Sequence, residues 1–360
     1  MSAALSRRAL LGALAAWPGG GAAARPAEAR LMPAVAAPPS AELLAVWESF
    51  RQGFLRPEGR VVDTGNGHVS HSEGQGWAMF CAERCDDRAS FERLWNWTRQ
   101  VLHRPGDRLL AWRFMPDAAD PVPDRNNAAD GDLFTAAALL LAGQRWNRPD
   151  YTEAGAAMAR DVLRLLVREV AGLTVLMPGA QGFEEADTVT LNPSYYAFPI
   201  LGVLARAVPD PAWLRLATDG LILLRRARFG RWDLPPDWLL LGRQDGSLGL
   251  SPRWPPRFSY DALRVPLYLR WAGLETEPAV RAAIRFWRDP SHPYLPAWAD
   301  LLNQRIAPYS APSGVQAVAY FAENVRLTDN ISRIPSVQGR EDYYSAVLKL
   351  LILSAFSATL

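Results

Sequence analysis

The sequence predicts an all-α protein with one folded domain, and three observations lead to this prediction. Apolar residues recur at three- and four-residue spacings over most of the chain after residue 40. Several of these segments are apolar on most faces, at 136–142, 214–224 and 347–353, which is typical of helices buried on more than one side. Strand-like segments are few and do not alternate regularly with helices, which argues against a parallel-sheet enzyme.

The predicted helices follow one another without an obvious domain boundary. No linker rich in Pro and Ser divides residues 41–360, and charge is spread evenly over them. We expect helices at about 41–54, 73–85, 88–103, 130–146, 149–170, 193–207, 210–227, 259–272, 277–288, 312–327 and 340–355, with a short one near 296–304 that brings the count to about twelve. Residues 173–177 and 188–191 are expected to form a small β-hairpin around the turn 178–182.

Five interruptions between the helices are long and rich in Gly, Pro and Trp. They cover residues 56–72, 104–129, 172–192, 228–258 and 289–311. Loops of this length in a compact domain are usually functional rather than simple connectors, so we expect the site to be built on them.

The first forty residues resemble an export signal rather than a folded segment. Arg7 and Arg8 directly precede a short apolar run, and small residues follow it. The run is too short to span a bilayer but suits a signal peptide, and the arginine pair favours the twin-arginine route. We therefore expect residues 1–29 to be a signal peptide and 30–40 a flexible Ala/Pro-rich segment. The mature chain is expected in the periplasm or outside the cell, with no stable membrane anchor.

Composition excludes several classes of function. Lys and Arg number 39 against 37 for Asp and Glu, a net charge of +2, and no block of like charges is present, which excludes a nucleic-acid binder. The two cysteines, Cys81 and Cys85, lie one helical turn apart and are expected to be buried thiols. Together with His68 and His71 they match no common zinc spacing, so no metal is expected. No phosphate-binding loop and no GxSxG elbow occur, and we expect no cofactor.

Carboxylates concentrate where long loops enter helices. Glu73 follows Ser72 at one helix start, Asp130 and Asp132 flank a glycine at another, and Asp261 precedes Arg264 by three residues at a third. Each has a structural explanation, as a helix cap or, for Asp261, as an ion pair with Arg264. An Asp held beside an Arg is also the ionised carboxylate that a general base requires. The residues alone leave both explanations open.

If the helices alternate between an inner and an outer layer, the helix starts that carry these carboxylates come to lie on one face. There they would form a cleft lined with acids and aromatic rings, which suits a neutral polysaccharide because sugar rings stack on aromatic faces. Tyrosines enter the same face after the turn Asn192–Pro193. The loop tryptophans Trp77, Trp112, Trp238 and Trp254 are stacking candidates, whereas Trp95, Trp97, Trp146 and Trp271 fall within helices and are expected in the core.

Seven motifs follow one another in a fixed order along the chain. The most specific is the nineteen-residue stretch 128–146, which contains the DGD triplet at 130–132. The others are SEGQ at 72–75, AWRF at 111–114, PGxxGF at 178–183, LNPSY at 191–195, PPDW at 235–238 and SYDALRV at 259–265, and the late DYY at 342–344 also fits. Together, from about residue 45 to 350, they resemble glycoside hydrolase family 8, most closely its periplasmic endo-β-1,4-glucanases of bacterial cellulose synthesis.

The resemblance implies a fold, a reaction and a set of residues. The fold would be an (α/α)6 barrel, with long loops and the small hairpin at the cleft face. The reaction would be hydrolysis of internal β-1,4 bonds of cellulose with inversion. Glu73 would be the general acid, Asp261 the general base, and Asp130 the carboxylate that supports substrate and transition state. The substrate-binding residues would be Trp112, Asp132, Tyr195, Trp238, Tyr260, Arg264 and Tyr344.

Two other functions stay open on the sequence. One is a different family specificity, as a chitosanase, xylanase or mixed-linkage glucanase. The other is a largely non-catalytic glucan-binding assembly factor of a cellulose-export complex. In each case the expected partner is a polysaccharide, a β-1,4-glucan chain in the favoured reading, with the cellulose synthase and export machinery as a further expected partner. The protein itself is expected to be a monomer.

Overall fold

The computed structural model describes residues 38–323 and 342–358, and within them the chain is mostly helical. This confirms the predicted all-α class. The described α-helices are Ala41–Phe54 (α2), Ser72–Arg84 (α3), Arg88–Val101 (α4), Ala129–Arg145 (α5), Pro149–Leu166 (α6), Phe198–Ala207 (α7), Pro211–Arg226 (α8), Arg264–Trp271 (α9), Pro278–Trp287 (α10), Ser313–Glu323 (α11) and Tyr343–Ala358 (α12). A 3₁₀ helix, η1, covers Pro193–Tyr195.

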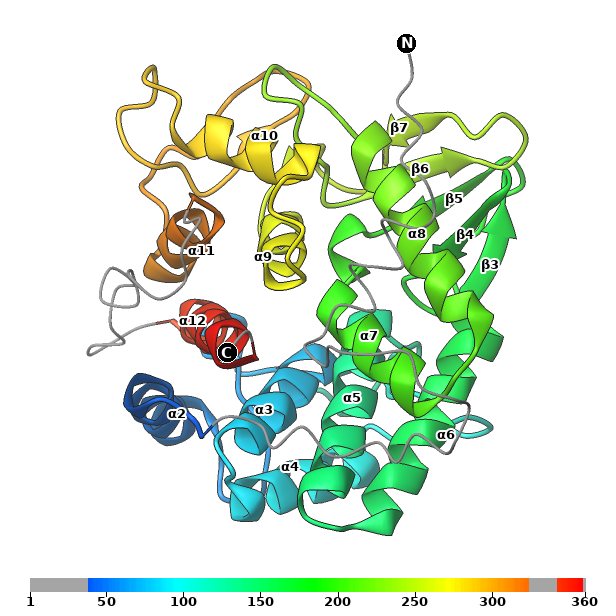
Figure 1. Ribbon diagram of the computed structural model, residues 1–360, viewed down its shortest axis with the longest axis vertical. Coiled ribbons are helices and arrows are strands. Elements are labelled where there is room, and N and C mark those ends of the chain that lie inside the picture. The colour runs from blue at the N-terminus through cyan, green and yellow to red at the C-terminus, as the bar shows by residue number, and fades with distance from the viewer. Residues whose placement is uncertain (1–37, 324–341, 359–360) are drawn as a thin grey trace, which may run out of the picture.

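The helices are arranged as an inner ring with an outer layer, the arrangement of an (α/α)6 fold (Figure 1). Contacts run from α3 to α5, α7 and α9, and then through α11 and α12 back to α3. The intervening helices lie outside: α4 packs on α3, α6 on α5, α8 on α7, and α10 on α9. The first described helix, α2, packs on the last, α12, so the two ends of the helical body meet.

The inner helices are held by close packing of their apolar faces. On α5, every residue from Ala129 to Leu140 is buried, which explains why its sequence lacks a polar face. The ring of Phe134 on α5 meets Trp77 of α3 and Tyr268 of α9, with centroid separations of 6.2 and 5.9 Å. These three helices therefore share one aromatic core below their N-terminal ends.

The short strands fasten loops rather than build a layer, and here two sequence predictions are wrong. Leu173–Leu176 (β4) pairs with Val167–Val170 (β3), which was expected as the end of a helix. Thr188–Leu191 (β5) pairs with Leu239–Gly242 (β6), which also pairs with Leu248–Leu250 (β7). The two segments expected to form one hairpin thus belong to different sheets, because each finds its partner outside the 173–191 segment.

The predicted short helix at 296–304 is also wrong. Ala299–Asp300 (β9) is instead a strand paired with Arg257–Phe258 (β8), next to the turn that carries Asp261. A further two-stranded sheet joins Ser70–His71 (β1) to Arg113–Phe114 (β2). Two of the long loops are therefore tied by backbone hydrogen bonds to segments beside predicted site residues.

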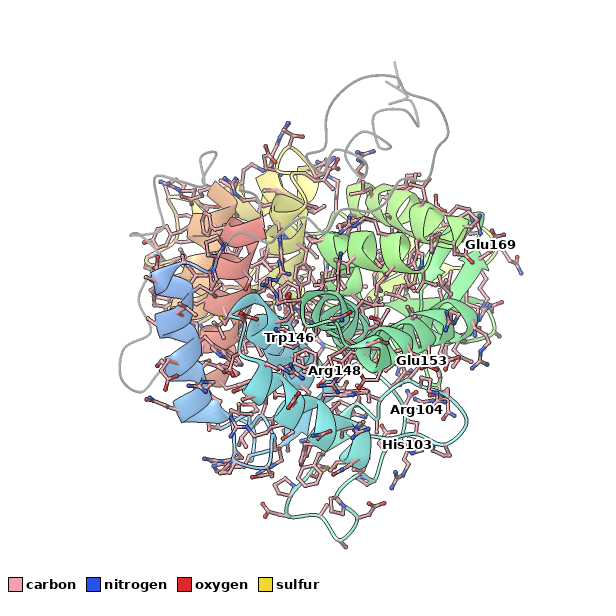
Figure 2. The ribbon with its side chains drawn as sticks, turned by 60° about the horizontal axis from the view of Figure 1, so that its bottom comes forward. His103, Arg104, Trp146, Arg148, Glu153 and Glu169 are labelled. Carbon is pink, nitrogen blue, oxygen red and sulfur yellow. The ribbon has the colours of Figure 1, made fainter. Side chains whose placement is uncertain are left out.

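Polar contacts close the turn between α5 and α6, which Figure 2 shows with Trp146 and Arg148 labelled. Trp146 donates its indole N–H to Asp86 at 2.6 Å, and Arg148 donates to Glu92 of α4 at 3.0 Å. Trp146 and Trp95 are half-buried, whereas Trp97 and Trp271 are in the core as expected. These contacts join an outer helix to the α5–α6 turn.

Some predictions lie outside the described residues. These predictions are the signal peptide at 1–29, most of the segment at 30–40, and the ends of two helices, at 324–327 and 340–341. Within residues 38–323 and 342–358, no helix has the length and hydropathy needed to cross a membrane. Cys81 and Cys85 are both buried and free, as their spacing predicts.

Candidate active site

The predicted site residues sit at the first turns of inner helices. Glu73 is the second residue of α3 and Asp130 the second residue of α5. Arg264 is the first residue of α9, and Asp261 lies in the turn just before it. Ser72 is the first residue of α3 and does not cap it, and its buried hydroxyl has no hydrogen-bond partner within the described part of the chain. The convergence of helix starts expected from the sequence is present.

Gly131 brings the first turns of α3 and α5 together. A Cβ at this position would lie 2.3 Å from the Ser72 hydroxyl and 2.7 Å from the Glu73 backbone nitrogen. Only glycine allows the two backbones to approach this closely. Because Glu73 and Asp130 flank this contact, their carboxylates are placed side by side.

Arg264 joins three carboxylates. Its Nη1 pairs with Glu73 and lies 3.3 Å from Asp130, and its Nη2 lies 2.6 Å from Asp261. The Arg264 and Asp130 side chains are only 2% and 4% exposed, whereas Glu73 is 22% and Asp261 31% exposed. The guanidinium thus lies between two carboxylates that solvent or a ligand can reach, with a third buried behind them.

The guanidinium is held in place by further contacts. Its Nη2 donates to the Ser194 hydroxyl at 2.9 Å, and its carbon lies 5.2 Å from the Trp77 ring centroid and 6.0 Å from that of Tyr195. Trp77 is fully buried, so the expectation that it stacks on a sugar is wrong. Its ring instead packs against the Arg264 guanidinium as a cation–π contact.

Burial and mutual repulsion raise the pKa values of two of these carboxylates. The pKa of Asp130 lies well above its usual range because of burial and then the charge of Glu73, with Arg264 acting in the opposite direction. Asp130 also forms a hydrogen bond with Glu73 that favours its protonated form. Burial also raises the pKa of Asp261, although Arg264 and the Asn192 amide oppose this. Arg264 therefore limits the shift of Asp261 but does not reverse it.

Two residues beside Asp261 were missed by the sequence reasoning. Asp237 is buried, and one of its oxygens accepts the backbone N–H groups of Ser259 and Ala262 at 2.9 and 2.8 Å. It thereby holds the turn that carries Asp261. Burial, and then the charge of Asp261, raise the pKa of Asp237 to about 7. Its only sequence signal is its position in the PPDW motif, in which Trp238 and not Asp237 was predicted to bind substrate.

Asn192 is the second missed residue, although it belongs to the LNPSY motif. Its Oδ1 accepts both the backbone N–H and the hydroxyl of Ser194, at 3.0 and 2.7 Å. These two bonds orient the amide so that its NH2 group is turned away from Ser194. The Asn192 side chain also acts to lower the pKa of Asp261. Asn192 and Ser194 thus connect the surroundings of Asp261 and Arg264.

Asp132 has a different place from the one expected. It is fully buried, and its two oxygens accept from the Leu110 backbone N–H at 2.8 Å and from Asn127 Nδ2 at 2.7 Å. Asn127 in turn accepts from Arg104, which Figure 2 labels on the loop after α4. Burial raises the pKa of Asp132 to about 8. With both oxygens occupied by protein groups, Asp132 anchors the 104–127 loop instead of facing a ligand.

Partly exposed aromatic rings flank the carboxylates. Trp112 is tied to the start of α3, because Ser72 donates its backbone N–H to the Trp112 carbonyl at 3.0 Å. The indole N–H of Trp112 donates to the Asp124 carboxylate at 2.7 Å. Trp238 stacks on Trp254 with a centroid separation of 4.2 Å and an interplanar angle of 11°. Both rings are half-buried, and Phe183 stacks on Trp238 at 5.8 Å. That they bind sugar rings stays a prediction.

Tyrosines lie beside Asp261. Tyr344 of α12 donates its hydroxyl to the Tyr260 carbonyl, and the two rings meet edge to face at 5.8 Å. Tyr260 is 38% exposed. Tyr195 is largely buried behind Arg264. The structure therefore brings together all the predicted site residues except Asp132, which contacts Asn127 and Leu110 instead.

No group of three or more His, Cys, Asp or Glu side chains in the described part of the chain is arranged to hold a metal ion. The three carboxylates here are instead matched by one guanidinium. Two accessible acids on either side of a buried cation, flanked by aromatic rings, form an arrangement suited to proton transfer on a sugar chain.

A family model for glycosyl hydrolases family 8 matches residues 26–357. The chain belongs to this family. It is 47% identical over 309 residues to a probable endoglucanase of Novacetimonas hansenii, covering 86% of this chain and 89% of that protein. It is 40% identical over 282 residues to an endoglucanase of Cellulomonas uda, covering 78% of this chain and 77% of that protein.

Solved structures of two glucanases agree with the arrangement of the helices. The endo-β-1,4-glucanase CMCax from Acetobacter xylinum superposes with a TM-score of 0.82 at 45% identity, over 87% of this chain and 97% of that one. A β-1,3-1,4-glucanase from Paenibacillus, at 17% identity and a TM-score of 0.66, shares the fold. The (α/α)6 architecture expected from the sequence resemblance is thereby confirmed.

Proposed function

We propose that the protein is an inverting endo-β-1,4-glucanase, with Glu73 as general acid and Asp261 as general base. The observation that carries this proposal is the sharing of the Arg264 guanidinium by Glu73, Asp130 and Asp261. The names of the relatives at 40–47% identity, all endoglucanases, support the substrate class.

The chemistry requires two carboxyl groups in opposite protonation states. In an inverting glycosidase one acid protonates the leaving oxygen while the other activates water on the far face of the ring, across a gap of roughly 6.5–9.5 Å. Glu73 and Asp261 contact different nitrogens of one guanidinium, so that group separates them. Both retain exposed surface, which a substrate and a water molecule need.

Asp130 supports the acid. Burial and the charge of Glu73 raise the pKa of Asp130 well above its usual range, and the hydrogen bond with Glu73 also favours the protonated form of Asp130. A protonated Asp130 would reduce the negative charge beside Glu73. Arg264 and the Asn192 amide favour the ionised form of Asp261, as a base requires.

The expected substrate path follows the aromatic rings. Trp112 and Trp238 would stack on sugar rings on the approaches to the carboxylates, and Tyr195, Tyr260 and Tyr344 would line the cleavage position. We further propose that the protein acts as an exported monomer in the periplasm, where it trims nascent glucan beside a cellulose synthase. The arginine pair and apolar run of residues 7–17 support export.

Proton NMR of the products tests the substrate and the stereochemistry together. Carboxymethylcellulose, xylan and chitosan are compared, and the enzyme is expected to release new reducing ends from carboxymethylcellulose in the α configuration first. A β product first would contradict inversion. Cleavage of xylan or chitosan in place of the glucan would contradict the substrate class.

The two proposed catalytic acids are tested by neutral isosteres. Glu73→Gln and Asp261→Asn should each lower kcat by about 10²–10⁴-fold, because each removes one proton transfer, while cellohexaose binding measured by calorimetry is retained. Glu58→Gln, which alters an exposed carboxylate on a surface loop, is the matched control. Near-normal turnover in either test variant would remove that residue from its role.

A further inference from the structure

The loop 289–311 presents an exposed tyrosine next to the turn that carries Asp261. Tyr309 is 45% exposed and its hydroxyl lies 3.4 Å from that of Tyr260, which is itself 38% exposed. Large exposed aromatic side chains are uncommon on this protein. Two of them lie in contact here, and one of them, Tyr260, directly precedes the partly exposed Asp261 in the chain.

The position of Tyr309 is fixed by the fold rather than left to a free loop. Strand β9 pairs with β8, which ends one residue before the turn at 259–263. Within the loop, Ala307 donates its backbone N–H to the Trp298 carbonyl at 3.0 Å, and Tyr294 donates its hydroxyl to the Ala307 carbonyl at 2.9 Å. The segment that carries Tyr309 is therefore fastened beside β9, and β9 pairs with the strand that leads into the Asp261 turn.

The hydroxyl of Tyr309 is also oriented. Trp298 donates its indole N–H to it at 3.1 Å, and Arg257 of β8 stacks on the Trp298 ring at 4.0 Å. Because the Tyr309 oxygen already accepts from Trp298, its own O–H is available to donate, either to Tyr260 or to a ligand hydroxyl. An exposed ring edge with an oriented donor is the combination that binds a sugar ring.

We propose that Tyr309 forms, with Tyr260, an additional glucose-binding subsite beyond the cleavage position. This inference rests on the proposed glucanase function and adds to it a binding determinant from the 289–311 loop. The glucan would pass from Asp261 over Tyr260 to Tyr309. The subsite would then be filled only by chains long enough to reach it.

The test compares Tyr309→Ala and Tyr309→Phe with the wild type on cello-oligosaccharides of increasing length. For Tyr309→Ala, kcat/KM on the longest oligosaccharide should fall about fivefold to tenfold, the value of one aromatic contact, while the shortest cleaved one is unaffected. Tyr309→Phe keeps the ring and should retain most of the preference for long chains. Products from the longest oligosaccharide should shift as well.

Tyr320→Ala is the matched control, because Tyr320 is a tyrosine of similar exposure on α11. It should leave the length dependence unchanged. An equal loss on all lengths in Tyr309→Ala, no loss on any, or the same loss in Tyr320→Ala would overturn the subsite. Failure of the glucanase proposal is distinguishable, since the wild type would then not cleave the cello-oligosaccharides at all.

Discussion

At the residue scale, one buried arginine organises the chemistry of the site. Arg264 compensates three carboxylates of which only two are accessible. Breaking a buried charge network by removing one partner costs several kcal/mol, because the remaining charges lose their compensation. The arginine therefore both stabilises the helix starts and compensates the charge of the carboxylates around it.

Asp237 should act as a positioning residue for Asp261. Asp237→Ala leaves the N–H groups of Ser259 and Ala262 without their acceptor, so the base turn loses its support. We expect kcat to fall by about 10–100-fold with KM nearly unchanged, since a displaced base slows the proton transfer and not the binding. Asp237→Asn keeps an oxygen acceptor and should restore most of the activity.

Steady-state kinetics on folded protein, checked by circular dichroism, measures this effect. Asp219→Ala is the control, because Asp219 also accepts a backbone N–H, that of Thr174, but in the β3–β4 hairpin. If Asp237→Ala has wild-type kcat, or if the Asn variant is as slow as the Ala variant, Asp237 does not position the base through its acceptor oxygen.

At the element scale, the contact between α3 and α5 decides where two of the carboxylates lie. Gly131→Ala would place a methyl group against the Glu73 backbone nitrogen, so the helices must separate. We expect a loss of about 1–3 kcal/mol in the free energy of unfolding, together with a larger loss of activity than this destabilisation alone explains. Urea unfolding and kinetics on the same preparation measure both.

Gly53→Ala provides the comparison for the Gly131 variant. Gly53 lies within α2, and nothing approaches within 4 Å of the position that its Cβ would take. This substitution should leave activity unchanged and raise stability slightly, since alanine favours the helix. A Gly131→Ala protein with unchanged activity would show that the close approach of α3 and α5 does not position Glu73 and Asp130.

Helices were more predictable than strand partners, for a physical reason. The bounds of α2 were predicted to the residue, because Ser40 caps the helix and the apolar spacing runs to Phe54. The partner of β5 lies some fifty residues later in the chain, in a long loop. A strand's pairing depends on what the tertiary fold brings beside it, and no local pattern in 188–191 contains that information.

The same reasoning separates the site residues that were predicted from those that were missed. Glu73, Asp130 and Asp261 are marked by their positions at helix starts and by family motifs. The role of Asp237 exists only because residues 259–262 fold back onto it. Asp132 and Trp77 look functional in sequence because they adjoin the motifs of the proposed catalytic acids, yet both side chains are buried.

At the scale of the whole molecule, buried carboxyls set the dependence of stability on pH. The pKa values of Asp237 and Asp132 are raised to about 7 and about 8, far above the value of roughly 3.9 in an unfolded chain. At pH values between the unfolded and the folded pKa of each carboxyl, the folded protein binds more protons than the unfolded one. Stability should therefore be highest in mild acid and fall as the pH rises toward about 8.

Urea unfolding at several pH values and constant ionic strength measures this slope. Each carboxyl contributes up to about 1.4 kcal/mol per pH unit within its window. Asp132→Asn removes one titrating group and should flatten the decline, even if the variant is less stable overall. A stability that rises steadily from about pH 5 to 8 would contradict the prediction.

The meeting of α2 with α12 has a consequence for how the protein comes into being. The last helix of the described body supplies Tyr344 to the site and also covers the first helix. A chain that lacks α12 leaves α2 without its neighbour and Tyr260 without its hydroxyl donor. Such a shortened chain should therefore never acquire enzymatic competence, however complete the preceding helices are.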